Sequence, residues 1–104
     1  MQSEVLKGHV DLLVLAVLAR EPAHGYRIVE LIRVQSRGAF DLAEGTVYPA
    51  LYRLERNGLV ASRWQTVDGR RRRIYRPTRL GRRELARRQQ GWSEFADAMQ
   101  AVLA

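Results

Sequence analysis

Four side chains between Tyr48 and Arg56 carry the clearest chemistry that this sequence offers. Tyr48 and Tyr52 lie four residues apart, and Arg53 and Arg56 follow within two helical turns. A planar guanidinium can donate two parallel hydrogen bonds to a phosphate or to the edge of a guanine, and a phenol can bond a phosphate oxygen. The chemistry indicated is recognition of a polyanion.

Catalytic chemistry has little support in the same chain. Cysteine is absent, and the two histidines, His9 and His24, lie in different segments without a carboxylate pair or a glycine-rich phosphate loop. Isolated histidines are more often structural than catalytic. We therefore expect no enzyme activity, no metal and no cofactor. The lack of cysteine also fits a reducing cytoplasm.

The positive charge is concentrated in the second part of the chain. Residues 1–62 hold seven basic and seven acidic groups, whereas residues 63–104 hold eleven arginines and four acids, so the net charge of +7 arises there. A basic patch on a small domain indicates a polyanionic partner, with nucleic acid first. The alternative is that the charge only keeps the protein in solution.

The segment that carries the tyrosines has the pattern of an amphipathic helix. Val47, Leu51 and Leu54 are spaced i, i+4 and i+7, which predicts one buried stripe. The glycine of Asn57-Gly58 suits the left-handed conformation that often follows a helix end. The face opposite the stripe would hold Pro49, Tyr52, Arg53 and Arg56.

Pro49 constrains where this helix begins. A proline costs little in the first turn, because the N–H groups there have no acceptor within the helix. We therefore expect the N-cap at Thr46, Val47 or Tyr48, and Thr46 is chemically the best of these. A helix that starts there directs its positive end, Thr46 and Tyr48 outward, where N–H groups and hydroxyls can meet phosphates.

Two helices are expected before this segment. The apolar run at residues 12–19 is too short to span a bilayer. Asp11 adjoins it, which argues against a secretion signal, so we expect a helix buried on nearly all sides and no membrane partner. After Pro22, apolar residues at helical spacing predict a second amphipathic helix that ends near Ser36 and Gly38.

A β-hairpin is predicted around Asp68-Gly69, since both positions of a tight turn must tolerate positive φ. A two-residue turn would pair Val67 with Arg70 and place Trp64 opposite Arg73. A longer loop would change the facing residues. Pro77 would end the pairing, and Thr78 is a good N-cap for a following helix.

The last segment repeats with a period of seven residues. Leu85, Trp92 and Met99 share one heptad position, while Phe95 and Val102 share another with Arg88. Too little of the domain remains to cover this apolar stripe. The stripe therefore indicates that a second chain packs against it. Packing within the monomer is the alternative.

Three helices, a hairpin and a long terminal helix predict a mainly α fold with a small β-hairpin. The order is that of a winged helix-turn-helix. We expect a DNA-binding domain at residues 1–78 and a C-terminal dimerisation helix at residues 79–104.

These segments resemble the PadR family of transcriptional regulators between Leu6 and Leu85. The similar stretches are LKGHVDLLVLAVL, PAHGYRIVELI, LAEGTVYPALYRLERNGLV and RRRRIYRPTRLGRREL. The resemblance implies a dimeric repressor that binds double-stranded DNA. Because a dimer axis would relate two recognition helices, we expect the operator to be an inverted repeat. The single C-terminal helix is similar to that of short-form members.

The resemblance also assigns roles to residues. It aligns Thr46, Tyr48, Tyr52 and Arg53 with the helix that enters the major groove, and Arg70, Arg71, Arg72 and Arg73 with the wing. Pro49 and Arg56 are further DNA-binding candidates, because they share the outward face of the same helix. His24 and Tyr26 lie where the family can touch phosphate, although a capping or buried role is equally open. Arg56 could instead pair with solvent or an acid.

The dimer interface expected from these patterns combines the first and last helices. It comprises Leu12, Leu13, Leu85, Trp92, Phe95, Met99 and Val102. By resemblance to drug-sensing members, Trp92 is also a candidate site for a small aromatic effector, and a plain interface role is the alternative. Rival functions are a winged-helix module that binds an acidic protein, and RNA binding through Trp64 and Tyr75.

Overall fold

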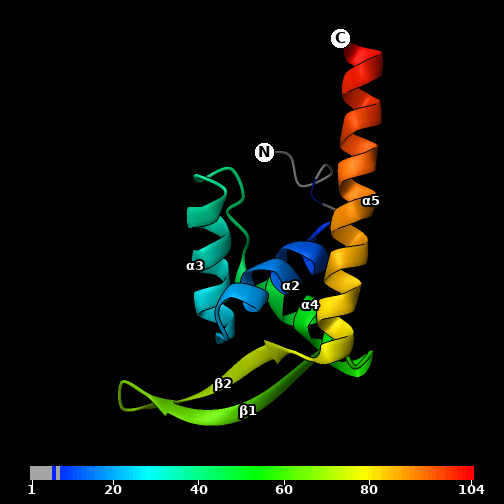
Figure 1. Cartoon of the computed structure of the whole chain (residues 1–104). Coiled ribbons are helices and arrows are strands. Elements are labelled where there is room, and N and C mark those ends of the chain that lie inside the picture. The colour runs from blue at the N-terminus through cyan, green and yellow to red at the C-terminus, as the bar shows by residue number, and fades with distance from the viewer. Residues whose placement is uncertain (1–5, 7) are drawn as a thin grey trace.

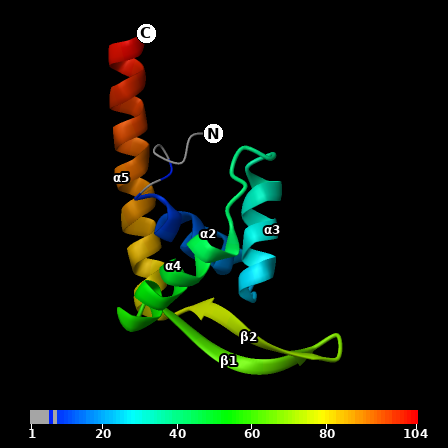
Figure 2. The ribbon, with the colours of Figure 1, turned by 180° about the vertical axis from the view of Figure 1, so that it is seen from behind.

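The computed structural model describes residue 6 and residues 8–104. Between residues 8 and 78 the elements are, in chain order, α2 (Val10–Arg20), α3 (Gly25–Gln35), α4 (Glu44–Arg56), β1 (Val60–Val67) and β2 (Arg70–Pro77). Helix α5 (Arg79–Leu103) ends the chain. Figures 1 and 2 show α2 between α3 and α5, with the β1–β2 hairpin projecting beyond the helices. The predicted mainly α fold with one hairpin, in winged helix-turn-helix order, is confirmed.

Helix α2 supplies the centre of the core. Its side chains Val14, Leu15 and Leu18 are almost fully buried, and they meet Leu51 and Leu54 of α4. Burying a Val or Leu side chain contributes about 1.5–3 kcal/mol, so this cluster is a main source of stability. The remaining α2 residues are mostly half-buried. Full burial is therefore limited to one side of α2, and its other apolar side chains are partly buried against the same core. No helix among residues 8–104 has the length and apolar character needed to cross a membrane.

Helix α3 follows Pro22, as the sequence predicted, and it begins directly after His24. The ring nitrogen Nδ1 of His24 accepts a hydrogen bond of 3.2 Å from the Arg27 N–H and so caps the helix. The chain just before it is fixed by a backbone bridge between Ala23 and Tyr75 of β2. The α3 helix ends at Gln35, and Gly38 follows with a φ of +82°.

Helix α4 begins earlier than predicted. Its N-cap is Ala43 rather than Thr46, Val47 or Tyr48, and Pro49 is the sixth helical residue, outside the first turn. The proline leaves the Gly45 carbonyl without its usual partner. Both residues are exposed, so water can satisfy that carbonyl. The prediction failed because it treated the helix interior as closed to proline.

The hairpin has the register that a two-residue turn predicts. Val67 pairs with Arg70, and Trp64 lies opposite Arg73. Asp68 and Gly69 have φ values of +51° and +77°, as a two-residue turn of this hand requires.

The start of α5 is tied to the end of α4. Thr78 caps α5 by accepting a 3.0 Å hydrogen bond from the Gly81 N–H, and its hydroxyl donates to the Gly58 carbonyl at 2.6 Å. A Cβ on Gly81 would lie 1.9 Å from the Leu59 carbonyl oxygen. Only glycine permits this approach, so the direction of α5 depends on it.

We expect Gly81→Ala to lower the free energy of unfolding by about 1–3 kcal/mol, because the backbone near Leu59 must move. Gly45→Ala is the matched control. Gly45 also lies in the first turn of a helix, but a Cβ there meets nothing within 4 Å. That control should be neutral or stabilising by up to about 1 kcal/mol. Urea denaturation compares them, and equal stabilities for the two variants would contradict the close contact at Gly81.

Candidate nucleic-acid interface

One side of α4, which we call its free side, is exposed in the part of the chain that the structure describes. Val47, Ala50, Leu51 and Leu54 are buried on the opposite side, as the apolar stripe predicted. Pro49, Tyr52 and Arg56 are exposed, and the Arg56 guanidinium lies 5.8 Å from the Tyr52 ring centre. An exposed helix face with a guanidinium and a phenol is suited to the major groove of DNA.

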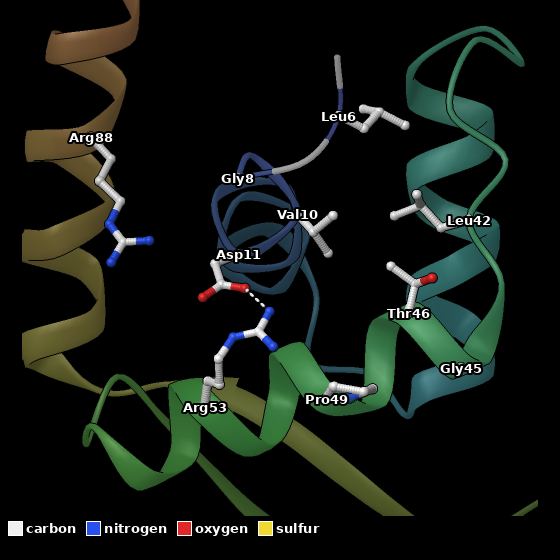
Figure 3. Close-up of a pocket in the computed structure, with 10 residues that line it drawn as sticks. All are labelled: Leu6, Gly8, Val10, Asp11, Leu42, Gly45, Thr46, Pro49, Arg53 and Arg88. Carbon is white, nitrogen blue, oxygen red and sulfur yellow. Dashed lines mark hydrogen bonds and ion pairs between the residues drawn. The ribbon is translucent and has the colours of Figure 1, made fainter. Parts of the chain in front are cut away.

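Arg53 lies at the flank of this face and is held by an acid that sequence reasoning missed. Its Nη2 donates to Oδ1 of Asp11 at 2.8 Å (Figure 3). This contact raises the pKa of Arg53 above its usual value, chiefly through the hydrogen bond to Asp11. The pair borders a cleft of about 720 Å³ that α2 and α4 form with Arg88 of α5. The partners are 42 residues apart, so no local spacing could have indicated the pair.

Tyr48 and Thr46 occupy the first half of α4. The Tyr48 ring is close to the start of α3, where a Cβ on Gly25 would lie 2.4 Å from its Cζ. Gly25 thus leaves room for the tyrosine, a role that the sequence did not suggest. Thr46 is exposed beside the cleft and does not cap the helix.

His24 and Tyr26 differ in their surroundings. His24 is half-buried as the cap of α3, and its pKa is lowered, mainly by burial and then by Arg72 and Arg27. A neutral imidazole matches its role as a hydrogen-bond acceptor. Tyr26 is 57% exposed, so the alternative of a buried role for this residue is wrong.

The four wing arginines are not equivalent. Arg70 and Arg71 are exposed, whereas Arg72 is half-buried. The Arg73 Nε donates to the Ser62 hydroxyl at 2.8 Å, and its Nη2 lies 3.6 Å from Oε2 of Glu55. Arg73 is therefore partly committed to contacts within the chain.

The predicted interface stripe divides in two. Trp92, Phe95, Met99 and Val102 are exposed along α5, and Leu12 and Leu13 are half-buried. Leu85, in contrast, is only 8% exposed and belongs to the core of its own chain. Its assignment to the dimer interface was wrong, because the first turns of α5 pack against α2.

Trp92 lies close to the start of α2. Its ring centre is 5.2 Å from that of His9 in an edge-to-face arrangement and 5.9 Å from that of Phe95. Together with Leu12 and Gly91 they line a cavity of about 320 Å³. Residues 8–104 hold no group of three or more His, Asp or Glu side chains placed to bind a metal ion.

Comparisons with known proteins agree with this architecture. A transcriptional regulator of Mycobacterium tuberculosis is 37% identical over 89% of this chain and 84% of that protein. A solved PadR family transcription regulator from Clostridium difficile has a TM-score of 0.81 at 32% identity, covering 93% of this chain and 100% of the other. A transcriptional regulator from Clostridium thermocellum has a TM-score of 0.86 at 29% identity, covering 97% and 96%.

Residues 14–87 match the family model described as the transcriptional regulator PadR-like family. The match spans most of the chain, from the core of α2 through the start of α5. Its members are regulators rather than enzymes, in agreement with the absence of a catalytic constellation from the sequence. The resemblance drawn from the sequence is thereby confirmed, and this chain belongs to the PadR-like family of transcriptional regulators.

Proposed function

We propose that the chain is a cytoplasmic transcriptional repressor that binds an inverted-repeat operator as a homodimer. The observation that carries this proposal is the free side of α4, where Tyr52 and Arg56 are exposed next to a basic hairpin. The helix would enter the major groove, and the hairpin would follow the adjacent phosphates. Bound to an operator, such a dimer represses by occupying DNA that the transcription machinery needs.

Dimerisation is supported by the apolar surface of α5. Trp92, Phe95 and Met99 are each about half exposed on one side of a helix that extends well past the other elements (Figure 1). Contiguous aromatic exposure of this kind is typical of an interface. A two-fold axis is the commonest way for one such patch to cover itself. It would relate two α4 helices and so favour an inverted repeat in the DNA.

A planar aromatic effector is a natural ligand for the cavity beside Trp92. The indole face and Phe95 supply stacking surfaces, and Leu12 closes one side. A ligand there would act on the same surface that we assign to the dimer, and so could alter the spacing of the two α4 helices.

Selection of bound sequences from a random DNA pool tests the proposed function. We expect enrichment of an inverted repeat with half-sites about 10 bp apart, or a multiple of this, because two recognition helices must face the same side of the duplex. Enrichment of an isolated half-site would contradict the dimeric mode. No enrichment, together with binding to an acidic protein, would favour the alternative of a protein-interaction module.

Trp92→Asp should convert the dimer into a monomer, because a carboxylate would be buried at the proposed interface. Gln90→Asp adds the same charge two residues earlier, nearly opposite on α5, and should leave the dimer intact. Sedimentation equilibrium measures both. A concentration-independent monomer for the unmodified chain would contradict the proposal directly.

The two groups of arginines should affect binding differently. Arg53 lies on a rigid helix, and exposed ion pairs contribute only about 0–1 kcal/mol, so a base can displace Asp11. We expect Arg53→Ala to cost roughly 1–3 kcal/mol on the selected site and to relax one base pair per half-site. Replacing Arg70 and Arg71 with Ala should weaken binding to all sequences and lower the salt slope by about 0.9 per lost phosphate contact.

The measurement is binding to matched and singly substituted operators at several salt concentrations. The opposite result would be that Arg53→Ala weakened binding to every sequence alike while the wing variants changed base preference. It would contradict the assignment of base recognition to Arg53 and of phosphate contacts to the wing arginines.

A further inference from the structure

A chain of contacts joins the recognition helix to the wing. The Ser62 hydroxyl of β1 donates to Oε2 of Glu55 on α4 at 2.7 Å, and it accepts from Nε of Arg73 on β2 at 2.8 Å. Arg73 also approaches Glu55 directly, with an Nη2 to Oε2 distance of 3.6 Å. The carboxylate thus offsets part of the Arg73 charge. This arginine serves to fix the hairpin against α4, and less of its charge is available to a ligand.

Trp64 extends this chain of contacts toward the tip of the hairpin. It lies two residues beyond Ser62 on the same strand face and directly opposite Arg73. The indole is 53% exposed, so its ring is open to other side chains of the hairpin. Its ring centre lies 5.7 Å from Cζ of Arg73 and 5.3 Å from Cζ of Arg71. Both guanidiniums are within the range of cation–π attraction.

Arg70 and Arg71 are both exposed, and of these two only Arg71 lies against the Trp64 ring. Among the described residues it makes no hydrogen bond or ion pair, and its contact with the indole leaves its N–H groups free to donate. Its neighbour Arg72 lies on the other strand face, and its charge acts on His24 at the start of α3. Arg71 therefore has both an ordered position and unused donors.

We propose that Trp64 is a positioning residue that presents Arg71 to a DNA phosphate, with Arg73 and Glu55 fixing this pair relative to α4. The proposal rests on the proposed function, since it requires a duplex on the free side of α4. A guanidinium held in advance on a ring loses less conformational freedom on binding than a solvated one. The phosphate contact would lie at a set distance from the bases that α4 reads, and the wing would thereby help to fix the register.

The two arginines provide a matched comparison, because they are adjacent in sequence and have the same charge. Arg71→Ala should weaken binding to all DNA sequences and reduce the salt slope by about 1.8, that is, about 0.9 for each of the two phosphate contacts that the dimer would lose. Arg72→Ala should reduce the slope by less than half as much. Equal slopes for the two variants would show that only the total charge of the wing matters, which would overturn the proposal.

The role of Trp64 is tested by two substitutions. Trp64→Leu removes the aromatic face and should weaken binding about three- to tenfold, whereas Trp64→Phe keeps a face and should stay within about twofold of the unmodified chain. Gln65→Ala, on the opposite strand face, controls for damage to the exposed hairpin. Circular dichroism and urea denaturation of each variant report whether the fold is retained.

A double-mutant cycle separates positioning from direct contact. In the Arg71→Ala background, Trp64→Leu should change affinity by less than about twofold, because its effect acts through Arg71. An undiminished loss there, or equal binding by Trp64→Leu and Trp64→Phe, would overturn the assignment. Failure of the proposed function would look different, since the unmodified chain would then select no DNA sequence at all.

Discussion

The packing of α4 on α2 is the constraint on which the rest of this structure depends. Leu51 and Leu54 are each only 1% exposed, against the Val14, Leu15 and Leu18 side chains of α2. Because these side chains fix the rotation of α4 about its own axis, they also determine which residues remain outside. Tyr52 and Arg56 are exposed as a direct consequence of that burial. A core substitution in α4 should therefore act on DNA recognition as well as on stability.

Two further contacts fix the positions of α5 and of the hairpin relative to α4. At its C-terminal end, Gly81 lets α5 approach the Leu59 carbonyl, and so the direction of the long helix is tied to that of α4. Beside it, Ser62 and Arg73 join the hairpin to Glu55. The exposed stripe on α5 and the arginines of the wing are thus placed relative to one recognition helix. In a dimer the same contacts would set the distance between two such helices.

The elements that depend on local sequence were predictable, whereas the contacts between distant segments were not. Asp68-Gly69 indicated the hairpin turn, and Thr78 indicated the start of α5, because turns and caps involve neighbouring residues. The resemblance to a known family supplied the functional class. The start of α4 was misplaced because Pro49 was confined to a first turn. Leu85 was assigned to the interface because periodicity cannot distinguish a core from a partner. Asp11–Arg53 and Glu55–Ser62–Arg73 join separate elements, so spacing along the chain gave no signal for them.

The central claim is that the free side of α4 lies in the major groove, and a tethered DNA-cleaving reagent tests it most directly. Since the chain has no cysteine, Tyr52→Cys gives a single attachment point on α4, and Val34→Cys gives an exposed one near the end of α3 that Figure 1 places away from the hairpin. We predict cleavage within both half-sites of the selected operator from position 52 and none from position 34. Intact DNA with a reagent at position 52, in a complex that still binds its operator, would contradict the account.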